Sequence, residues 1–386
     1  MIQFRKNSYA NIILEYIALC GEFPYNSLDI LGKNKVILQR TLNNLKKEGY
    51  ITISGSGVMK TIRITKKSFE VIDAINPNFL QHYLTVSENH HFRGGTYKNN
   101  NVGARQTWRR HRMAEILCLM YQNGVKIWEY QKPQLSLSTS TIPQISENDL
   151  LFYTSKELKN ADKNQRYKTD FTRIMGAIFS PGGIYCVYNT HKGLMKWNSQ
   201  GEGKAQVLVE DIVQHNSQKH HEDFFVAEDA IMFGKGMSPV SDILNSNGSN
   251  KDSNGFELLS FDNTYRNIYY ITLDENGKEQ LKIMTSPCWH EKLCNAIFPE
   301  AFIDFKHSII DCDAIDKSSD TYILMFFDGN IGRLKRFKQA AYDSKKNFEL
   351  LCFPWQIDVL QQYVESKIKL RTLQLEDIKN IYKDTK

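Results

Sequence analysis

Amide and basic side chains recur at helical spacing between residues 36 and 47. At about 100° per residue, Leu38, Leu42 and Leu45 fall in one apolar stripe of a helix. The opposite side carries one aliphatic residue, two amides and two basic residues, namely Val36, Gln39, Arg40, Asn43 and Lys47. Gln, Asn and Arg can form paired hydrogen bonds with the edges of adenine or guanine, and Lys suits phosphate. The pattern therefore predicts a helix whose exposed face contacts DNA.

Two strands expected after this helix carry further basic residues. The segment 49–53 leads into a strand, the chain turns at residues 55–57, and the segment 59–65 returns. Lys60 and Arg63 on the returning strand are placed to contact backbone phosphates or a minor groove.

The elements that position these residues make up one N-terminal domain. We expect helices over 8–20, 26–31, 34–48 and 66–75, with Asn34 as the N-cap of the third. Three helices, a two-stranded hairpin and a closing helix form a winged helix-turn-helix, whose third helix normally lies in the major groove. The alternative is a winged helix that contacts only proteins and leaves its polar face to solvent.

The distribution of charge favours DNA over the alternative. Residues 1–115 contain 17 Lys and Arg and 8 Asp and Glu, a net charge of +9, whereas the whole chain carries +6. The remaining residues therefore sum to −3. A basic region on a slightly acidic body is expected of a domain that displaces counterions from phosphate.

A second basic segment follows the predicted domain. Residues 90–101 are polar, contain glycine and lack periodicity, which predicts an exposed linker. A helix then begins near residue 105 with basic residues around Trp108. Contact with a DNA backbone is expected for five arginines of this segment, Arg93, Arg105, Arg109, Arg110 and Arg112. The alternative is a solvated connector followed by a helix start that is merely basic.

Beyond residue 106 helices and strands alternate, which predicts a fold of the α+β or α/β class. We expect four segments: a winged helix over 1–78, a basic linker over 79–106, an α/β domain over 107–244 and a further α/β region over 256–386. Within the body, the patterns predict a strand over 125–130 and a hairpin near 268–284.

Four residues of the body could form a metal-dependent nuclease site: Glu129, Asp149, Glu157 and Lys159. Two carboxylates would hold Mg²⁺, and the lysine would orient or activate the attacking water. The pattern is short, and Glu202 and Lys204 form a second acid–lysine pair that could take the same role. The alternative is that Glu157 and Lys159 lie on the solvated surface of a core without catalysis.

The seven cysteines are odd in number and scattered, which is typical of reduced thiols in a cytoplasmic protein. Cys288, His290 and Cys294 are metal-capable types, but they lack the close cysteine pairs of zinc ribbons. We therefore expect an ordinary helix start and no bound metal there. The absence of a signal peptide and of an apolar run near twenty residues predicts a soluble protein without a membrane partner.

Several of these segments resemble the bacterial replication-relaxation family, whose members are proteins of plasmids and integrative elements. The resemblance covers roughly residues 8–235 and rests on the winged-helix pattern and on four short segments: 108–112, 128–129, 152–159 and 173–190. It implies DNA binding in the replication or transfer of a mobile element. It also implies that the second domain is similar to a restriction-endonuclease core.

The sequence thus predicts a sequence-specific binder of double-stranded DNA from a plasmid or integrative element, acting in its replication, transfer or regulation. Two alternatives stay open. One is a nuclease that needs Mg²⁺ and is guided by the winged helix; the other is a scaffold that recruits a replication or conjugation enzyme. The binder itself requires no cofactor. Whether it forms a homodimer, and what residues 245–386 do, the sequence leaves open.

Overall fold

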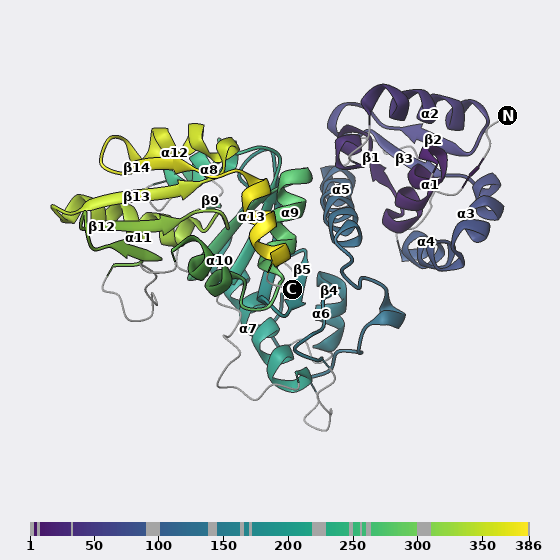
Figure 1. Cartoon of the computed structure of the whole chain (residues 1–386). Helices are drawn as coiled ribbons and strands as arrows, with labels where there is room; N and C mark the ends of the chain where they lie inside the picture. Colours follow the sequence, from purple (N-terminus) through teal and green to yellow (C-terminus); the bar gives the residue numbers. More distant parts are fainter. Residues whose placement is uncertain are drawn as a thin grey trace. The chain divides into compact units, whose positions relative to one another are not determined.

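The chain is a mixed α/β protein that divides into two compact units, Met1–Gln122 and Asn123–Lys386 (Figure 1). The computed structural model describes residues 4–5, 8–31, 34–89, 101–137, 145–162, 166–169, 172–217, 229–246, 250–254, 257–259, 264–298 and 310–384. Each unit buries apolar side chains of its own.

The first unit opens with two capped helices joined by a 3₁₀ helix. The hydroxyl of Ser8 caps α1 (Tyr9–Cys20), and the side chain of Asn34 caps α2 (Lys35–Lys47). Between them lies η1 (Tyr25–Leu31), a 3₁₀ helix where the sequence predicts an ordinary short helix. The predicted N-cap and the predicted third helix are confirmed.

A small sheet follows α2. Its three strands are β1 (Phe23–Pro24), β2 (Ile51–Ser54) and β3 (Thr61–Ile64). β2 and β3 form the predicted antiparallel hairpin, and β1, which the sequence does not predict, pairs with the other edge of β3. The connection contains the 3₁₀ helix η2 (Gly57–Met59). Gly55 begins this turn with φ +78°, and a Cβ there would lie 2.5 Å from the carbonyl oxygen of Met59.

Further helices complete the first unit: the 3₁₀ helix η3 (Lys66–Ser68), α3 (Phe69–Ile75), α4 (Pro77–Asn89) and α5 (Asn101–Gln122). α3 is confirmed, but much of the expected linker 79–106 is helical. Residues 79–89 belong to α4 because Phe79 and Tyr83 are buried. The remaining part, 90–100, lies outside the described residues.

Helix α5 belongs to the first unit, although the sequence places it at the start of an α/β domain at residue 107. The Cys20 thiol of α1 lies 3.6 Å from the carbonyl oxygen of Ala114 and 3.5 Å from the Cys118 sulfur, both of α5. Ala114 and Cys118 are fully buried. This packing against α1 explains why the compact unit ends at Gln122.

The second unit contains a five-stranded sheet with the order β10-β7-β6-β5-β4. Its strands are β4 (Leu151–Thr154), β5 (Gly176–Ser180), β6 (Gly183–His191), β7 (Asp229–Gly234) and β10 (Asn267–Thr272). β4, β5 and β6 are antiparallel, whereas β6, β7 and β10 are parallel. The parallel strands need crossover connections. The associated helices are α6 (Ser155–Ala161), α7 (Ser199–Asn216), α8 (Ser238–Leu244) and α9 (Glu275–Met284).

A four-stranded sheet follows, with the order β11-β12-β13-β14. Its strands are β11 (Ala314–Asp316), β12 (Thr321–Met325), β13 (Asn347–Cys352) and β14 (Lys369–Thr372), the last three parallel. Its helices are α10 (Trp289–Ile297), α11 (Ile331–Asp343), α12 (Ile357–Val364) and α13 (Leu375–Asp384). Smaller elements are η4 (Glu129–Gln131), β8 (Asn250–Lys251), β9 (Glu257–Leu258) and η6 (Pro354–Gln356).

The two larger sheets share one hydrophobic core. Tyr188 and Tyr270 of the first sheet and Leu324 and Leu350 of the second belong to the same buried cluster. The regions that the sequence separates near residue 250 are therefore packed together.

Two predicted elements of this unit are wrong. The expected strand 125–130 forms a single bridge, from Lys126 to Leu151, and ends in η4. The expected hairpin 268–284 is strand β10 followed by helix α9, because the Asp274 side chain caps a new helix by accepting a hydrogen bond from the backbone N–H of Gly277.

Candidate functional sites

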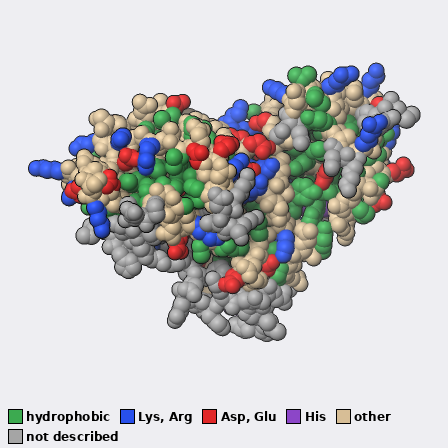
Figure 2. Space-filling model, viewed as in Figure 1, with side chains coloured by type: hydrophobic (Ala, Val, Ile, Leu, Met, Phe, Trp, Pro, Cys, Tyr) green, Lys and Arg blue, Asp and Glu red, His purple; other side chains and the backbone are tan. Residues whose placement is uncertain are grey.

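The face of α2 opposite its buried stripe is open to solvent. Leu38, Leu42 and Leu45 are buried, as predicted. Four of the five predicted DNA-binding residues on this helix are exposed, namely Val36, Arg40, Asn43 and Lys47. The fifth, Gln39, is half-buried. Figure 2 shows basic and hydrophobic side chains side by side along the edge of the first unit where α2 lies in Figure 1.

A chain of hydrogen bonds orients the two amides on this face. The Tyr25 hydroxyl donates to Gln39 Oε1 at 3.0 Å, and Gln39 Nε2 donates to Asn43 Oδ1 at 3.2 Å. The ammonium group of Lys60 lies 3.5 Å from the centre of the Tyr25 ring, at cation–π distance. Tyr25, which the sequence did not single out, therefore links the predicted wing residue Lys60 to the polar face of α2.

Arg63 and Arg110 have a partner within the first unit. Both guanidinium groups contact the buried carboxylate of Glu22, with N–O distances of 2.5 Å from Arg63 and 3.3 Å from Arg110. A buried carboxylate requires such pairing. These two arginines, predicted to contact phosphate, are engaged in holding α5 and β3 to Glu22.

The other predicted arginines lie on α5 or outside the described residues. Arg112 stacks over the ring of Trp108 with 5.6 Å between the guanidinium carbon and the ring centre. Arg109 is half-buried on the same helix. The backbone of Arg105 is part of α5, its side chain lies outside the described part, and Arg93 lies outside it altogether.

The predicted nuclease residues do not form a shared metal site. Glu157 caps α6 by accepting a hydrogen bond from the backbone N–H of Thr154, and it forms an ion pair of 2.6 Å with Lys132. Lys159 lies on the same helix, not on a strand. Asp149 pairs with Lys126 at 2.8 Å. Glu129 is exposed in η4.

Glu202, the acidic residue of the alternative pair with Lys204, has a structural role. Glu202 is fully buried on α7. It accepts hydrogen bonds from the backbone N–H of Arg173 at 2.7 Å and from the Tyr188 hydroxyl at 3.0 Å. Its carboxylate thus satisfies two buried donors.

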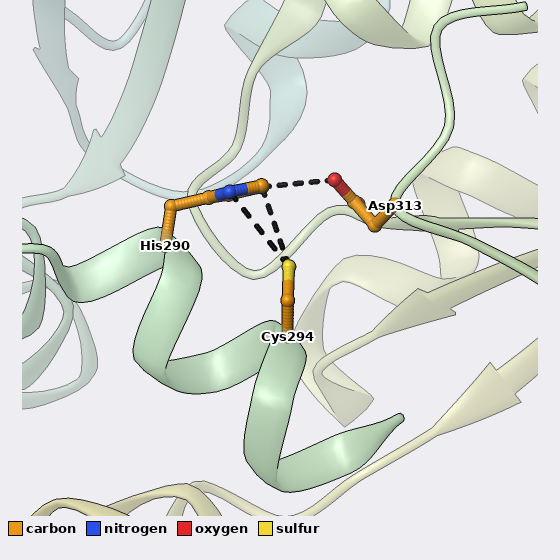
Figure 3. Close-up of side chains that lie close together, drawn as sticks. All are labelled: His290, Cys294 and Asp313. Carbon is orange, nitrogen blue, oxygen red and sulfur yellow. Dashed lines mark hydrogen bonds and ion pairs between the residues drawn. The ribbon is translucent and has the colours of Figure 1, made fainter. Parts of the chain in front are cut away.

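A buried cluster of metal-capable side chains lies in the second unit (Figure 3). His290 and Cys294 are one turn apart on α10, and Asp313 precedes β11. The His290 ring donates from Nε2 to Asp313 Oδ1 at 2.8 Å, and the Cys294 sulfur lies 3.7 Å from His290 Nδ1. Within the described segments, no other three His, Cys, Asp or Glu side chains approach closely enough to hold a metal ion.

Arg333 already bonds to one ligand atom of this cluster and lies close to a second. Its guanidinium donates to Asp313 Oδ1 at 2.7 Å and to Asp311 Oδ1 at 2.7 Å, and Nη1 lies 3.2 Å from His290 Nε2. The backbone N–H of Met325 donates to the second Asp313 oxygen at 2.6 Å. A divalent ion here would lie against a fixed positive charge.

The two acidic side chains of the cluster have pKa shifts in opposite directions. Burial would raise the pKa of the Asp313 carboxyl, but Arg333 and His290 hold it well below its usual range. Burial, together with the charge of Asp313, raises the pKa of the Cys294 thiol well above its usual value. Metal ligation and nucleophilic attack both require a thiolate. The hydrogen bonds and ion pairs of the cluster tie α10, α11 and the start of β11 together.

Comparison of the chain with known protein families, with curated proteins and with solved structures finds no significant match in any of the three. Among the described residues, no helix is long and apolar enough to cross a membrane.

Proposed function

We propose that the protein binds double-stranded DNA through the exposed face of α2. The observation that carries this proposal is that two basic side chains on this face have no partner among the described residues. The side chains of Arg40 and Lys47 are exposed and form no hydrogen bond or ion pair with any other described residue. They are therefore available to a ligand that offers base edges and phosphates.

The order of elements in the first unit supports the same proposal. α1, η1, α2, the hairpin β2–β3 and α3 follow one another as in a winged helix-turn-helix, with α2 as the helix that enters the major groove. The net charge of +9 over residues 1–115 supplies attraction to phosphate.

The proposed biological role rests on the resemblance of several sequence segments to the replication-relaxation family. We propose action in the replication, transfer or regulation of a plasmid or integrative element, as in the replication-relaxation family. The nuclease alternative is not proposed, because Glu157 is occupied by a helix cap and by Lys132.

Fluorescence anisotropy of the full-length protein with labelled duplexes tests the proposal. A duplex is first selected from a pool with a randomised core, and its affinity is then measured over a salt series. We expect the logarithm of the association constant to fall steeply with the logarithm of salt concentration. Lys47→Ala should reduce this slope by about one. The matched control is Lys156→Ala, which removes an exposed lysine of the second unit.

Two results would contradict DNA binding through α2. One is the absence of binding to any selected duplex at low salt. The other is equal loss of affinity in Lys47→Ala and Lys156→Ala, because this would mean that the contact depends on net charge and not on the α2 face.

A further inference from the structure

We propose that α2 reads A·T base pairs in the major groove, with Asn43 on adenine and with Val36 and Ile37 on the 5-methyl group of thymine. This inference rests on the proposed DNA binding and names the base pairs that the face recognises.

The first observation is aliphatic surface on a polar face. Val36 is 76% exposed and Ile37 is 44% exposed, in the first turn of α2. Their backbone N–H groups are both held by Asn34 Oδ1, at 3.0 and 3.3 Å, so the cap fixes this turn. The first turn of such a helix is the part that meets base edges. In the major groove, thymine is the base that offers an apolar methyl group to such side chains.

The second observation is a chain of hydrogen bonds that holds two amides in place. In the bonds that join Tyr25, Gln39 and Asn43, each carbonyl oxygen accepts and each amide nitrogen donates. Reversal of the Asn43 amide alone would bring two donors together. Reversal of both amides would keep the bonds, because the Tyr25 hydroxyl can also accept, and Asn43 offers a donor and an acceptor in either arrangement. Its oxygen keeps a second lone pair, and its Nδ2 forms no hydrogen bond with any other described group.

A donor beside an acceptor matches adenine. Adenine presents an acceptor at N7 and a donor at N6, whereas guanine presents two acceptors. Asn43 lies two helical turns after Val36 on the same side of α2, so both can face one groove. Because the amides are already oriented, binding orders fewer side-chain torsions.

Arg40 lies on the same face between these residues and suits guanine or phosphate. The proposal therefore concerns the base pairs opposite Val36, Ile37 and Asn43, and it assigns no base to Arg40.

Single-atom changes in the selected duplex test the proposal with the full-length protein. Replacement of thymine by uracil removes only the methyl group. At one or more positions we expect this to weaken binding about threefold to fivefold. Replacement of adenine by 7-deazaadenine removes the N7 acceptor, and we expect a loss of about fivefold to twentyfold at one position.

Variants connect each base change to its residue. The double variant Val36→Ala, Ile37→Ala should remove the difference between thymine and uracil. Asn43→Ala should remove the difference between adenine and 7-deazaadenine. Val207→Ala is the matched control, since it shortens another exposed valine (43% exposed) in the second unit. Circular dichroism checks that each variant is folded.

The outcomes separate this inference from the proposed function. If the protein binds duplexes but no uracil or 7-deazaadenine substitution changes the affinity, the A·T inference is wrong and DNA binding stands. The inference is also wrong if the base pairs that affect binding are all G·C. If the protein binds no duplex, both proposals fail.

Discussion

The polar side chains on α2 and those around Asp313 differ in what remains available to a ligand. Around Asp313 the groups satisfy one another: Arg333 bonds to two carboxylates, and both oxygens of Asp313 accept hydrogen bonds. On α2, Arg40 and Lys47 face solvent without a partner in the described part of the chain. Residue type alone would favour the His, Cys and Asp cluster as the functional site. We therefore base the proposed function on the side chains whose hydrogen-bonding capacity is not used by other described residues.

Burial explains the difference. A charged group removed from water must be paired, and the pairing uses up its hydrogen-bonding capacity. An exposed side chain is solvated by water that a ligand can displace.

The largest effect is expected from Asp313→Ala. The substitution leaves Arg333 buried without one of its two carboxylates, so we expect the free energy of unfolding to fall by about 3–5 kcal/mol. Urea unfolding measures this loss. Asp343→Ala, at an exposed position, should change stability by about 0.5 kcal/mol or less. A loss at Asp313 no larger than this control would mean that the cluster is not a structural network.

The contribution of Asp313 should also depend on pH. Its pKa is lower in the folded protein than the value of about 3.9 expected when unfolded. The difference in stability between the wild type and Asp313→Ala should therefore be complete above that pH and shrink as the pH falls below it. A difference that instead grows on acidification would contradict the assigned direction.

A smaller loss is expected from Glu22→Gln in the first unit. The change removes the negative charge that Arg63 and Arg110 share, and we expect a loss of about 1–3 kcal/mol because both arginines are partly open to solvent. Thermal unfolding measures the change. A stability equal to that of the wild type, with tighter DNA binding, would place these arginines with the α2 face instead.

Arg40→Ala should separate binding from stability. We expect a loss of about 1–3 kcal/mol in the free energy of DNA binding, and less than about 0.5 kcal/mol in that of unfolding. Anisotropy and urea unfolding on the same preparation measure the two. An unfolding loss comparable to that of Asp313→Ala would erase the distinction between the two regions.

The smallest effect is expected from metal removal. Because Arg333 already bonds to Asp313 and lies beside His290, a chelator should leave the melting temperature of the full-length protein unchanged. Differential scanning fluorimetry with and without added Zn²⁺ measures this. A rise with Zn²⁺ that is lost in Cys294→Ala would show that the cluster binds metal after all.

Local patterns in the sequence were sufficient for α2 and its surroundings. The buried stripe of Leu38, Leu42 and Leu45, the Asn34 cap and the hairpin after α2 depend on residues a few positions apart. Such interactions are set by helical and strand periodicity. The same reasoning failed at residues 268–284, where alternation suggested a second strand but Asp274 caps a helix.

Contacts between distant residues could not be predicted in this way. Glu22 and Arg110 are 88 positions apart, and Asp313 and Arg333 are 20 apart. No periodic pattern links such pairs. The place of α5 in the first unit likewise depends on its packing against α1.

The sequence by itself determined the helix that presents Gln39, Arg40 and Asn43, because periodicity decides which side of a helix is apolar. Only the tertiary structure decided which polar groups are still available. Tyr25 turns Gln39 and Asn43 into an oriented pair, Glu22 binds Arg63 and Arg110, and Arg333 fills the cluster around Asp313. Hydrogen bonds and ion pairs act over a few ångströms, so they form only between groups that folding brings together.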